Sequence, residues 1–185
     1  MVFSRKFTLL AALLLLAACR SDPIQFHTLT PAQLSGASRS AGTDIEIESI
    51  SVPPQVDRAQ IVIRQGNSGL AILETQWWGA SLTDELRSAL VDQLAPHPSR
   101  SRMSVRLDVQ RFDSIPGQYA LIDVQWRLRS LSSGDQALLT CHNTLKTPSG
   151  PGIDELVTAQ QNNVRQLAAL INKAADGPRG VCPEN

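Results

Sequence analysis

The chain has 185 residues, with 17 Lys and Arg against 17 Asp and Glu, so its formal net charge at pH 7 is zero. A balanced charge predicts no basic face and argues against nucleic acid as a partner. The length suits one domain and is long enough to bury a hydrophobic core.

The N-terminus has the pattern of a bacterial lipoprotein signal. Residues 5–6 are basic, and residues 7–18 form an uncharged run of mainly Leu and Ala. This run is too short for a membrane span, which needs about 20 apolar residues. The Leu-Ala-Ala-Cys at residues 16–19 resembles the lipobox, whose cysteine thiol receives a diacylglyceryl group. We expect removal of residues 1–18 and lipidation of Cys19; the alternative is an ordinary signal peptide with a chance cysteine.

The residue after the cysteine bears on the destination. It is Arg20 rather than Asp, which by the enterobacterial sorting rule favours the outer membrane. Several acyl chains together give stable anchoring where one chain does not. We therefore expect a periplasmic body, lipid-anchored to the outer membrane.

Residues 19–43 are rich in Ser, Thr, Ala, Gly and Pro and are predicted to be a tether with room for one short strand near residues 26–29. From residue 44 the pattern changes to alternating apolar and polar residues. Residues 44–185 are predicted to form one domain, without internal repeats.

The first half of this domain predicts a strand, a hairpin and a helix. Residues 45–52 alternate in polarity and end at two prolines, and residues 60–64 and 70–73 flank a Gly-Asn-Ser-Gly turn. Leucines then fall at helical spacing over residues 81–95, with Ser or Thr to cap the start.

The second half predicts three strands and a long helix. Alternation recurs over residues 103–109, 122–129 and 137–146, separated by turn sequences, which indicates an antiparallel meander. Residues 153–175 carry a long amphipathic stripe. We expect an α+β fold: a single two-layer domain, mainly antiparallel sheet, with two amphipathic helices packed on one face.

Lipidation of Cys19 would leave two of the three cysteines, Cys141 and Cys182. In the oxidising periplasm these two could form a disulfide, worth about 3–4 kcal/mol by loop-closure entropy. The alternative is a buried Cys141 and an unpaired Cys182. No metal-ligand spacing such as CxxC or HxxxH occurs, so neither a metal nor a cofactor is expected.

The sequence contains few candidate catalytic residues. The three histidines are His27, His97 and His142, and neither His27 nor His97 has a Ser or Cys at a known nucleophile spacing. The acidic pairs at 84–85 and 154–155 sit in first turns of predicted helices, where the helix dipole explains them. The sequence therefore predicts a protein that is not an enzyme.

Trp77 and Trp78 stand together before the first predicted helix. In an extended segment one ring faces the core and the other faces outward. The outward ring either packs on a loop or lies in an interface with a partner protein or lipid, where aromatic side chains are favoured.

These features resemble the ABC-type transport auxiliary lipoprotein family, also described as PqiC/YmbA-like. The resemblance covers nearly all of the chain after the signal. It includes a strand that ends in proline, a "hydrophobic-Asp-Arg-x-Gln-Ile-Val-x-Arg" strand, and a Trp followed by spaced leucines. The matching segments are residues 26–31, 45–54, 56–64, 78–94, 109–113, the strand around Trp126, and 157–171. The chain departs from the pattern in having His27 where Tyr is more common, and the pair Cys141 and Cys182 is not part of it.

The resemblance implies a role in lipid transport across the envelope. Such lipoproteins work with a permease, an ATPase and an MCE-domain protein that forms a conduit across the periplasm, and they contribute to envelope integrity. The conduit proteins are ring oligomers, so we expect a homo-oligomer, with a matching ring as one form.

Two other functions stay open from the sequence. One is a structural lipoprotein of another outer-membrane assembly, like the plug of the lipopolysaccharide translocon. The other is an envelope hydrolase, for which the three histidines would be essential.

Overall fold

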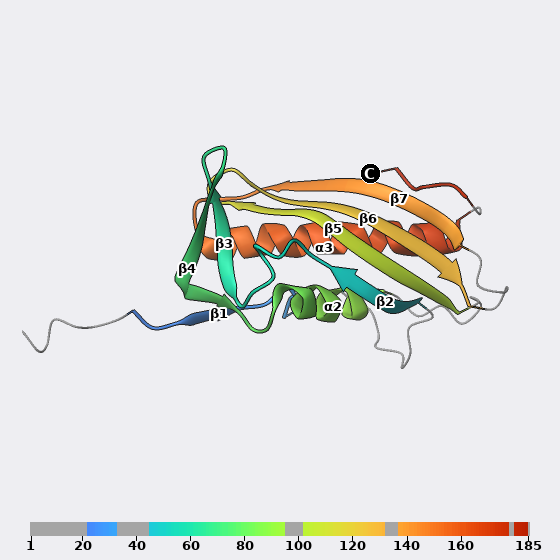
Figure 1. Cartoon of the computed structure of the whole chain (residues 1–185), viewed down its shortest axis with the longest axis horizontal. Coiled ribbons are helices and arrows are strands. Elements are labelled where there is room, and N and C mark those ends of the chain that lie inside the picture. Colours follow the sequence, from blue (N-terminus) through green and yellow to red (C-terminus); the bar gives the residue numbers. More distant parts are fainter. Residues whose placement is uncertain (1–21, 33–44, 95–101, 132–136, 178–179, 185) are drawn as a thin grey trace, which may run out of the picture.

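The computed structural model describes residues 22–32, 45–94, 102–131, 137–177 and 180–184 (Figure 1). In chain order the elements are β1 (Gln25–His27), β2 (Ile45–Ser51), β3 (Gln60–Gln65), β4 (Gly69–Trp78), α2 (Leu82–Gln93), β5 (Met103–Ile115), β6 (Tyr119–Ser130), β7 (Ala137–Pro148) and α3 (Ile153–Asp176). The α+β class is confirmed. The strands form two sheets, however, and not the single sheet expected from the sequence.

The larger sheet has four strands in the order β2-β5-β6-β7. Strands β5, β6 and β7 form the predicted antiparallel meander. Their apolar residues alternate with polar ones because successive side chains point to opposite faces of a strand. Strand β2 joins as a parallel neighbour of β5, and the connection between them includes the β3–β4 hairpin and α2. Parallel strands need such a long crossover.

The smaller sheet has three strands in the order β1-β4-β3. Strands β3 and β4 form the predicted hairpin, in which Gly66 has φ 60°, a left-handed conformation that glycine adopts at low cost. Strand β1 pairs in parallel with the end of β4, so the short strand expected near residues 26–29 is Gln25–His27. This sheet stands at one end of the molecule (Figure 1).

The division into two sheets follows from how β2 ends. Strand β2 pairs with β5 only as far as Asp108, and one residue after its end come Pro53 and Pro54, which lack backbone N–H groups. Beyond that point the β5–β6 register shifts between Val109 and Arg111, which moves Phe112 onto the core face. Strand β3 then lies beside β5 without joining its ladder.

Both helices pack on one face of the four-stranded sheet, as expected, with α3 along β6 and β7 and α2 beside α3 and β2 (Figure 1). Ser81 caps α2 by accepting the Asp84 N–H at 3.2 Å. Glu155 caps α3 by accepting the Gly152 N–H at 2.8 Å. Within the described residues, neither helix is both long and apolar enough to cross a bilayer.

The core lies between the helices and the sheet and includes two buried polar pairs. Trp126 is fully buried and donates its indole N–H to Asn143 at 2.8 Å. Gln160 of α3 donates to the Asp113 backbone carbonyl at 3.1 Å, which ties the helix to β5. Buried polar groups with partners are stabilising, whereas unpaired ones cost free energy.

Candidate functional site

The segment after β1 is held to both helices. Glu85 of α2 accepts the Leu29 backbone N–H and the Thr28 hydroxyl, each at 2.8 Å. Gln161 of α3 donates to the Thr28 carbonyl at 2.9 Å. Leu29 itself is fully buried in the core. The chain therefore enters the folded body at a fixed point.

His27 strengthens the same attachment. Its Nε2 lies 2.6 Å from the Gln76 side-chain oxygen, and its Nδ1 lies 3.5 Å from the Asp154 carboxylate at the start of α3. The Gly79 N–H donates to the His27 carbonyl at 2.9 Å. Through these contacts the buried His27 ring links β1 to β4 and to the start of α3.

This attachment lies within the segment that the sequence predicts as a tether with room for one short strand. Residues 19–43 include a strand and the core residue Leu29, so the body includes residues ahead of the boundary expected at residue 44. Cys19 lies outside the described residues, and only residues 20–24 separate it from β1.

The two adjacent tryptophans have different surroundings. Trp78 is 3% exposed and packs edge-on against Phe112 of β5, with ring centroids 6.5 Å apart. Trp77 is partly exposed and packs edge-on against Phe26 of β1 at 6.3 Å. Its indole N–H donates to the Glu74 carbonyl at 2.8 Å, which fixes the ring. Only Trp77 is therefore available to a partner.

Exposed apolar side chains gather on the face of the small sheet that carries Trp77. Cross-strand partners project from the same face. The register pairs Phe26 with Trp77. Trp77, Ile72 and Leu70 lie opposite Gln60, Val62 and Arg64, alternate residues of β3, although the register shifts between Gln60 and Val62 and Leu70 also borders the cavity described below. We call this set the apolar face; its members are Ile24 (47% exposed), Phe26 (67%), Leu70 (44%), Ile72 (48%) and Trp77.

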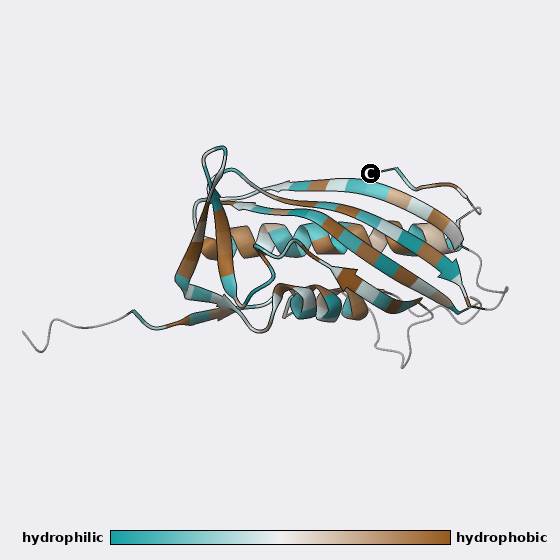
Figure 2. Ribbon diagram, in the orientation of Figure 1, coloured by the Kyte–Doolittle hydropathy of each residue, from teal (hydrophilic) through white to brown (hydrophobic). Residues whose placement is uncertain are grey.

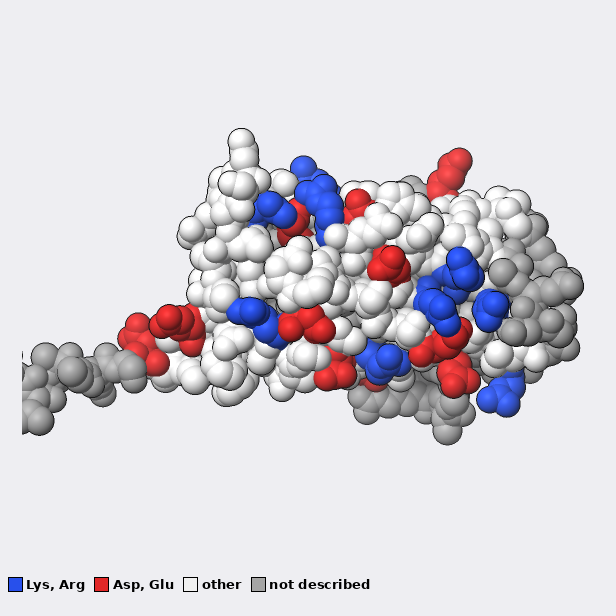
Figure 3. All heavy atoms as spheres, viewed as in Figure 1, with Lys and Arg blue, Asp and Glu red and all other residues white. Residues whose placement is uncertain are grey.

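The outer face of the four-stranded sheet is polar by contrast. Its exposed positions include Arg106, Gln125, Arg127, His142 and Lys146. Figure 2 shows alternating colours along β5, β6 and β7 but mainly hydrophobic segments along β3 and β4. Figure 3 shows charged side chains over the long strands and a largely uncharged surface on the hairpin at the other end. Exposed apolar surface is thus concentrated where the chain enters the body.

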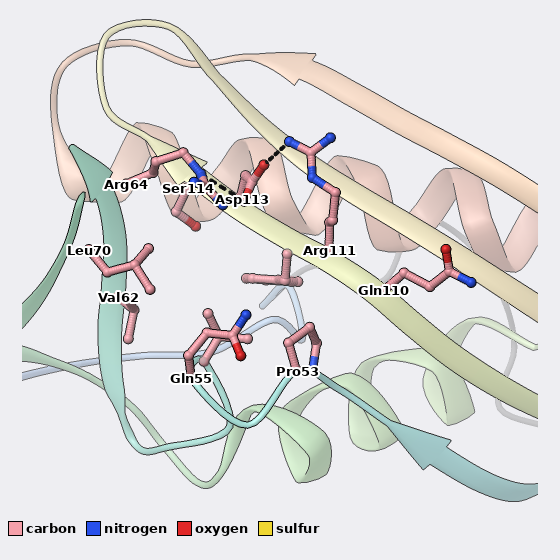
Figure 4. Close-up of a pocket in the computed structure, with 11 residues that line it drawn as sticks. Pro53, Gln55, Val62, Arg64, Leu70, Gln110, Arg111, Asp113 and Ser114 are labelled. Atoms are coloured by element: carbon pink, nitrogen blue, oxygen red, sulfur yellow. Dashed lines mark hydrogen bonds and ion pairs between the residues drawn. The ribbon is translucent and has the colours of Figure 1, made fainter. Parts of the chain in front are cut away.

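An ion cluster joins the two sheets. The Asp113 carboxylate of β5, 5% exposed, accepts two hydrogen bonds from Arg64 of β3 at 2.9 and 3.1 Å and is paired with Arg111 on its other side (Figure 4). The cavity beside it measures about 40 Å³ and is lined by both sheets and the residues after β2. Ligand pockets usually measure about 300–1,000 Å³, so this cavity is too small for a lipid. An open hollow that shares Arg64 and Arg111 with it, and is also lined by Ile63, Asn67 and Tyr119, measures about 790 Å³.

The remaining candidates for catalysis have structural partners. His142 pairs with Asp123 on the outer face of the long sheet, and His97 lies outside the described residues. Glu85 and Glu155 are occupied by the backbone bonds given above. Over the described part of the chain, no group of three His, Cys, Asp or Glu side chains is placed to hold a metal ion.

Cys141 and Cys182 are joined by a disulfide in the structure, with Cα atoms 5.7 Å apart. Cys141 lies on the core face of β7 and is 3% exposed. The bond holds the C-terminal segment against the edge strand of the larger sheet.

A family model for the ABC-type transport auxiliary lipoprotein component matches residues 27–172. The chain belongs to this family. It is therefore a membrane-anchored lipoprotein and an auxiliary component of an ABC-type transport system, which implies a non-catalytic role.

Solved structures share the fold. An uncharacterised protein superposes with TM-score 0.63 at 17% identity, covering 82% of this chain and 98% of its own. Protein XCC0632 from Xanthomonas campestris superposes with TM-score 0.60 at 20% identity, covering 72% of this chain and 84% of its own. No curated protein matches the sequence.

Proposed function

We propose that the chain is the outer-membrane-anchored, periplasmic accessory subunit of an MCE-type lipid transporter, and that it contributes to envelope integrity. Its partners are then an MCE-domain protein with its permease and ATPase, and it receives or anchors the conduit at the outer membrane. The observation that carries the proposal is the family match over residues 27–172, which coincides with the folded body.

The proposed division of labour suits the body. In this proposal a lipid travels through the partner, and the lipid-anchored chain holds that partner in place, which agrees with an auxiliary and non-catalytic component. We propose the lipid on Cys19 as the anchor and, since MCE conduits are ring-shaped, a ring of this chain as the receiving assembly.

Cross-linking in intact cells tests this function. The lipidated protein is cross-linked, purified and analysed by mass spectrometry for bound proteins. We expect recovery of an MCE-domain protein together with a permease and an ATPase. Recovery of one β-barrel protein without an MCE protein would instead favour a structural lipoprotein of another outer-membrane assembly.

The anchor and the oligomer need separate measurements. Intact mass of the membrane-extracted protein should show loss of residues 1–18 and added acyl mass on Cys19, and Cys19→Ser should abolish both. The acylated protein in detergent should give a mass by light scattering that is a multiple of one chain. A monomer at micromolar concentration would remove the ring from the proposal.

A further inference from the structure

We propose that the apolar face contacts the same lipid bilayer that holds the Cys19 lipid, and so seats the body directly on the membrane. This inference rests on the proposed lipid anchor. It adds a second membrane contact, made by the folded protein itself. The surface consists of the five side chains defined above, with Phe26 and Trp77 at its centre.

The exposure of these side chains calls for a partner. Of the seven large hydrophobic side chains exposed in the described part of the chain, four belong to this one face: Ile24, Phe26, Leu70 and Ile72. Clustered exposed apolar surface on a soluble body marks a protein or membrane contact, whereas scattered single residues do not. Trp77 adds an amphipathic ring, with its N–H already satisfied by the Glu74 carbonyl.

The short stretch of chain between Cys19 and the apolar face indicates that the membrane is what this face contacts. Ile24 is five residues after Cys19, and an extended chain spans at most about 3.6 Å per residue, so the two lie within about 18 Å. Because Thr28 and Leu29 are attached to both helices, the chain between Cys19 and the folded body cannot become longer. Once Cys19 is in the bilayer, the end of the molecule that carries this face cannot leave the membrane surface.

Charge indicates how the contact is made. Neither residues 22–32 nor β4 contains a Lys or Arg, while Asp22 and Glu74 are exposed beside the face. Arg64 of β3 is engaged with Asp113. Attraction to anionic headgroups therefore contributes little, and the contact depends on aromatic and aliphatic side chains at the boundary between headgroups and acyl chains, where Trp is favoured. We expect it to be insensitive to salt.

Fluorescence quenching by brominated lipid tests this contact on the mature, lipidated chain. The protein is reconstituted into phosphatidylcholine vesicles with plain or brominated acyl chains. Trp78 and Trp126 are buried, so Trp77 is the tryptophan placed to reach the quencher. We expect brominated lipid to remove the part of the emission that Trp77 contributes, and to leave the emission of Trp77→Phe unchanged.

Matched variants separate this surface from general hydrophobicity. The double variant Phe26→Asp, Ile72→Asp should lose the Trp77 quenching. Val91→Asp is the control, since Val91 on α2 is 45% exposed and lies outside the apolar face, and it should keep the quenching. A Trp77 that is quenched equally in the double variant and the control would overturn the inference.

Two other outcomes have distinct meanings. Protein that fails to float with the vesicles would show that the anchor is absent, which contradicts the proposed function itself. Protein that floats but has an unquenched Trp77 leaves the anchor intact and overturns the membrane contact. Cysteines placed at Phe26 that cross-link two copies of the chain in those vesicles would then identify a second copy as the occupant.

Discussion

The carboxylate of Glu85 accepts the backbone N–H of Leu29 at 2.8 Å, joining residues 56 positions apart in sequence. It is the contact by which the segment after β1 becomes part of the body. Because the carboxylate is buried and accepts the Thr28 hydroxyl as well, one side chain satisfies two donors that would otherwise lie unpaired.

Replacement of Glu85 by Ala should lower the free energy of unfolding by about 2–3 kcal/mol, since buried donors lose a charged acceptor. Urea denaturation measures this loss. Amide exchange should also speed up at Leu29 while that of the β5–β7 meander stays slow. Glu74→Ala is the control, because the Glu74 side chain is exposed, and it should leave both readouts unchanged. Fast exchange at Leu29 in the wild type would contradict the fixed entry point.

Replacement of Asp113 by Ala should uncouple the hairpin from the long sheet. The carboxylate is buried, but Arg64 and Arg111 are 29% and 51% exposed, so the guanidinium groups can turn to water. We therefore expect a loss of about 2 kcal/mol, below the full cost of breaking a buried pair. Urea denaturation again measures the loss, with Asp92→Ala, exposed on α2, as the control. Equal stability of the two variants would mean that packing alone joins the sheets.

The disulfide between Cys141 and Cys182 predicts a specific chemical state. Protein extracted from the membrane, denatured and treated with an alkylating reagent without reductant should show neither of these thiols modified. Cys182→Ser should lower the free energy of unfolding by about 3–4 kcal/mol, the loop-closure value for a separation of 41 residues. The same loss should appear in the wild type with reductant, and full alkylation without reductant would contradict the bond.

Much of the fold could be predicted because its signals are local. The alternation of Val105, Leu107 and Val109 with polar residues indicates a strand with one core face, and the meander needs only short turns. The leucines of α2 and the stripe of α3 mark helices in the same way. The lipobox is likewise a local signal, although Cys19 lies outside the described residues.

The parallel pairings could not be predicted, because they depend on contacts between distant segments. Nothing near Phe26 indicates that it lies beside Trp77, and β2 and β5 are separated by more than 50 residues. An extended segment puts Trp77 and Trp78 on opposite faces, but periodicity does not say which is buried. That choice follows from the packing of Trp78 on Phe112 and from a register irregularity in the β3–β4 hairpin.

The shape of the long sheet sets how far the protein can act from its membrane. Strands β5, β6 and β7 have 13, 12 and 12 residues, so at about 3.3 Å per residue they extend about 40 Å along the molecule. The proposed lipid attachment site, Cys19, precedes β1 in sequence, and β1 and the hairpin lie at one end of the molecule (Figure 1). In the membrane contact proposed above, that end lies at the bilayer and the strands are directed outward. The molecule would then be a short pillar whose far tip lies at a height that the strand lengths determine.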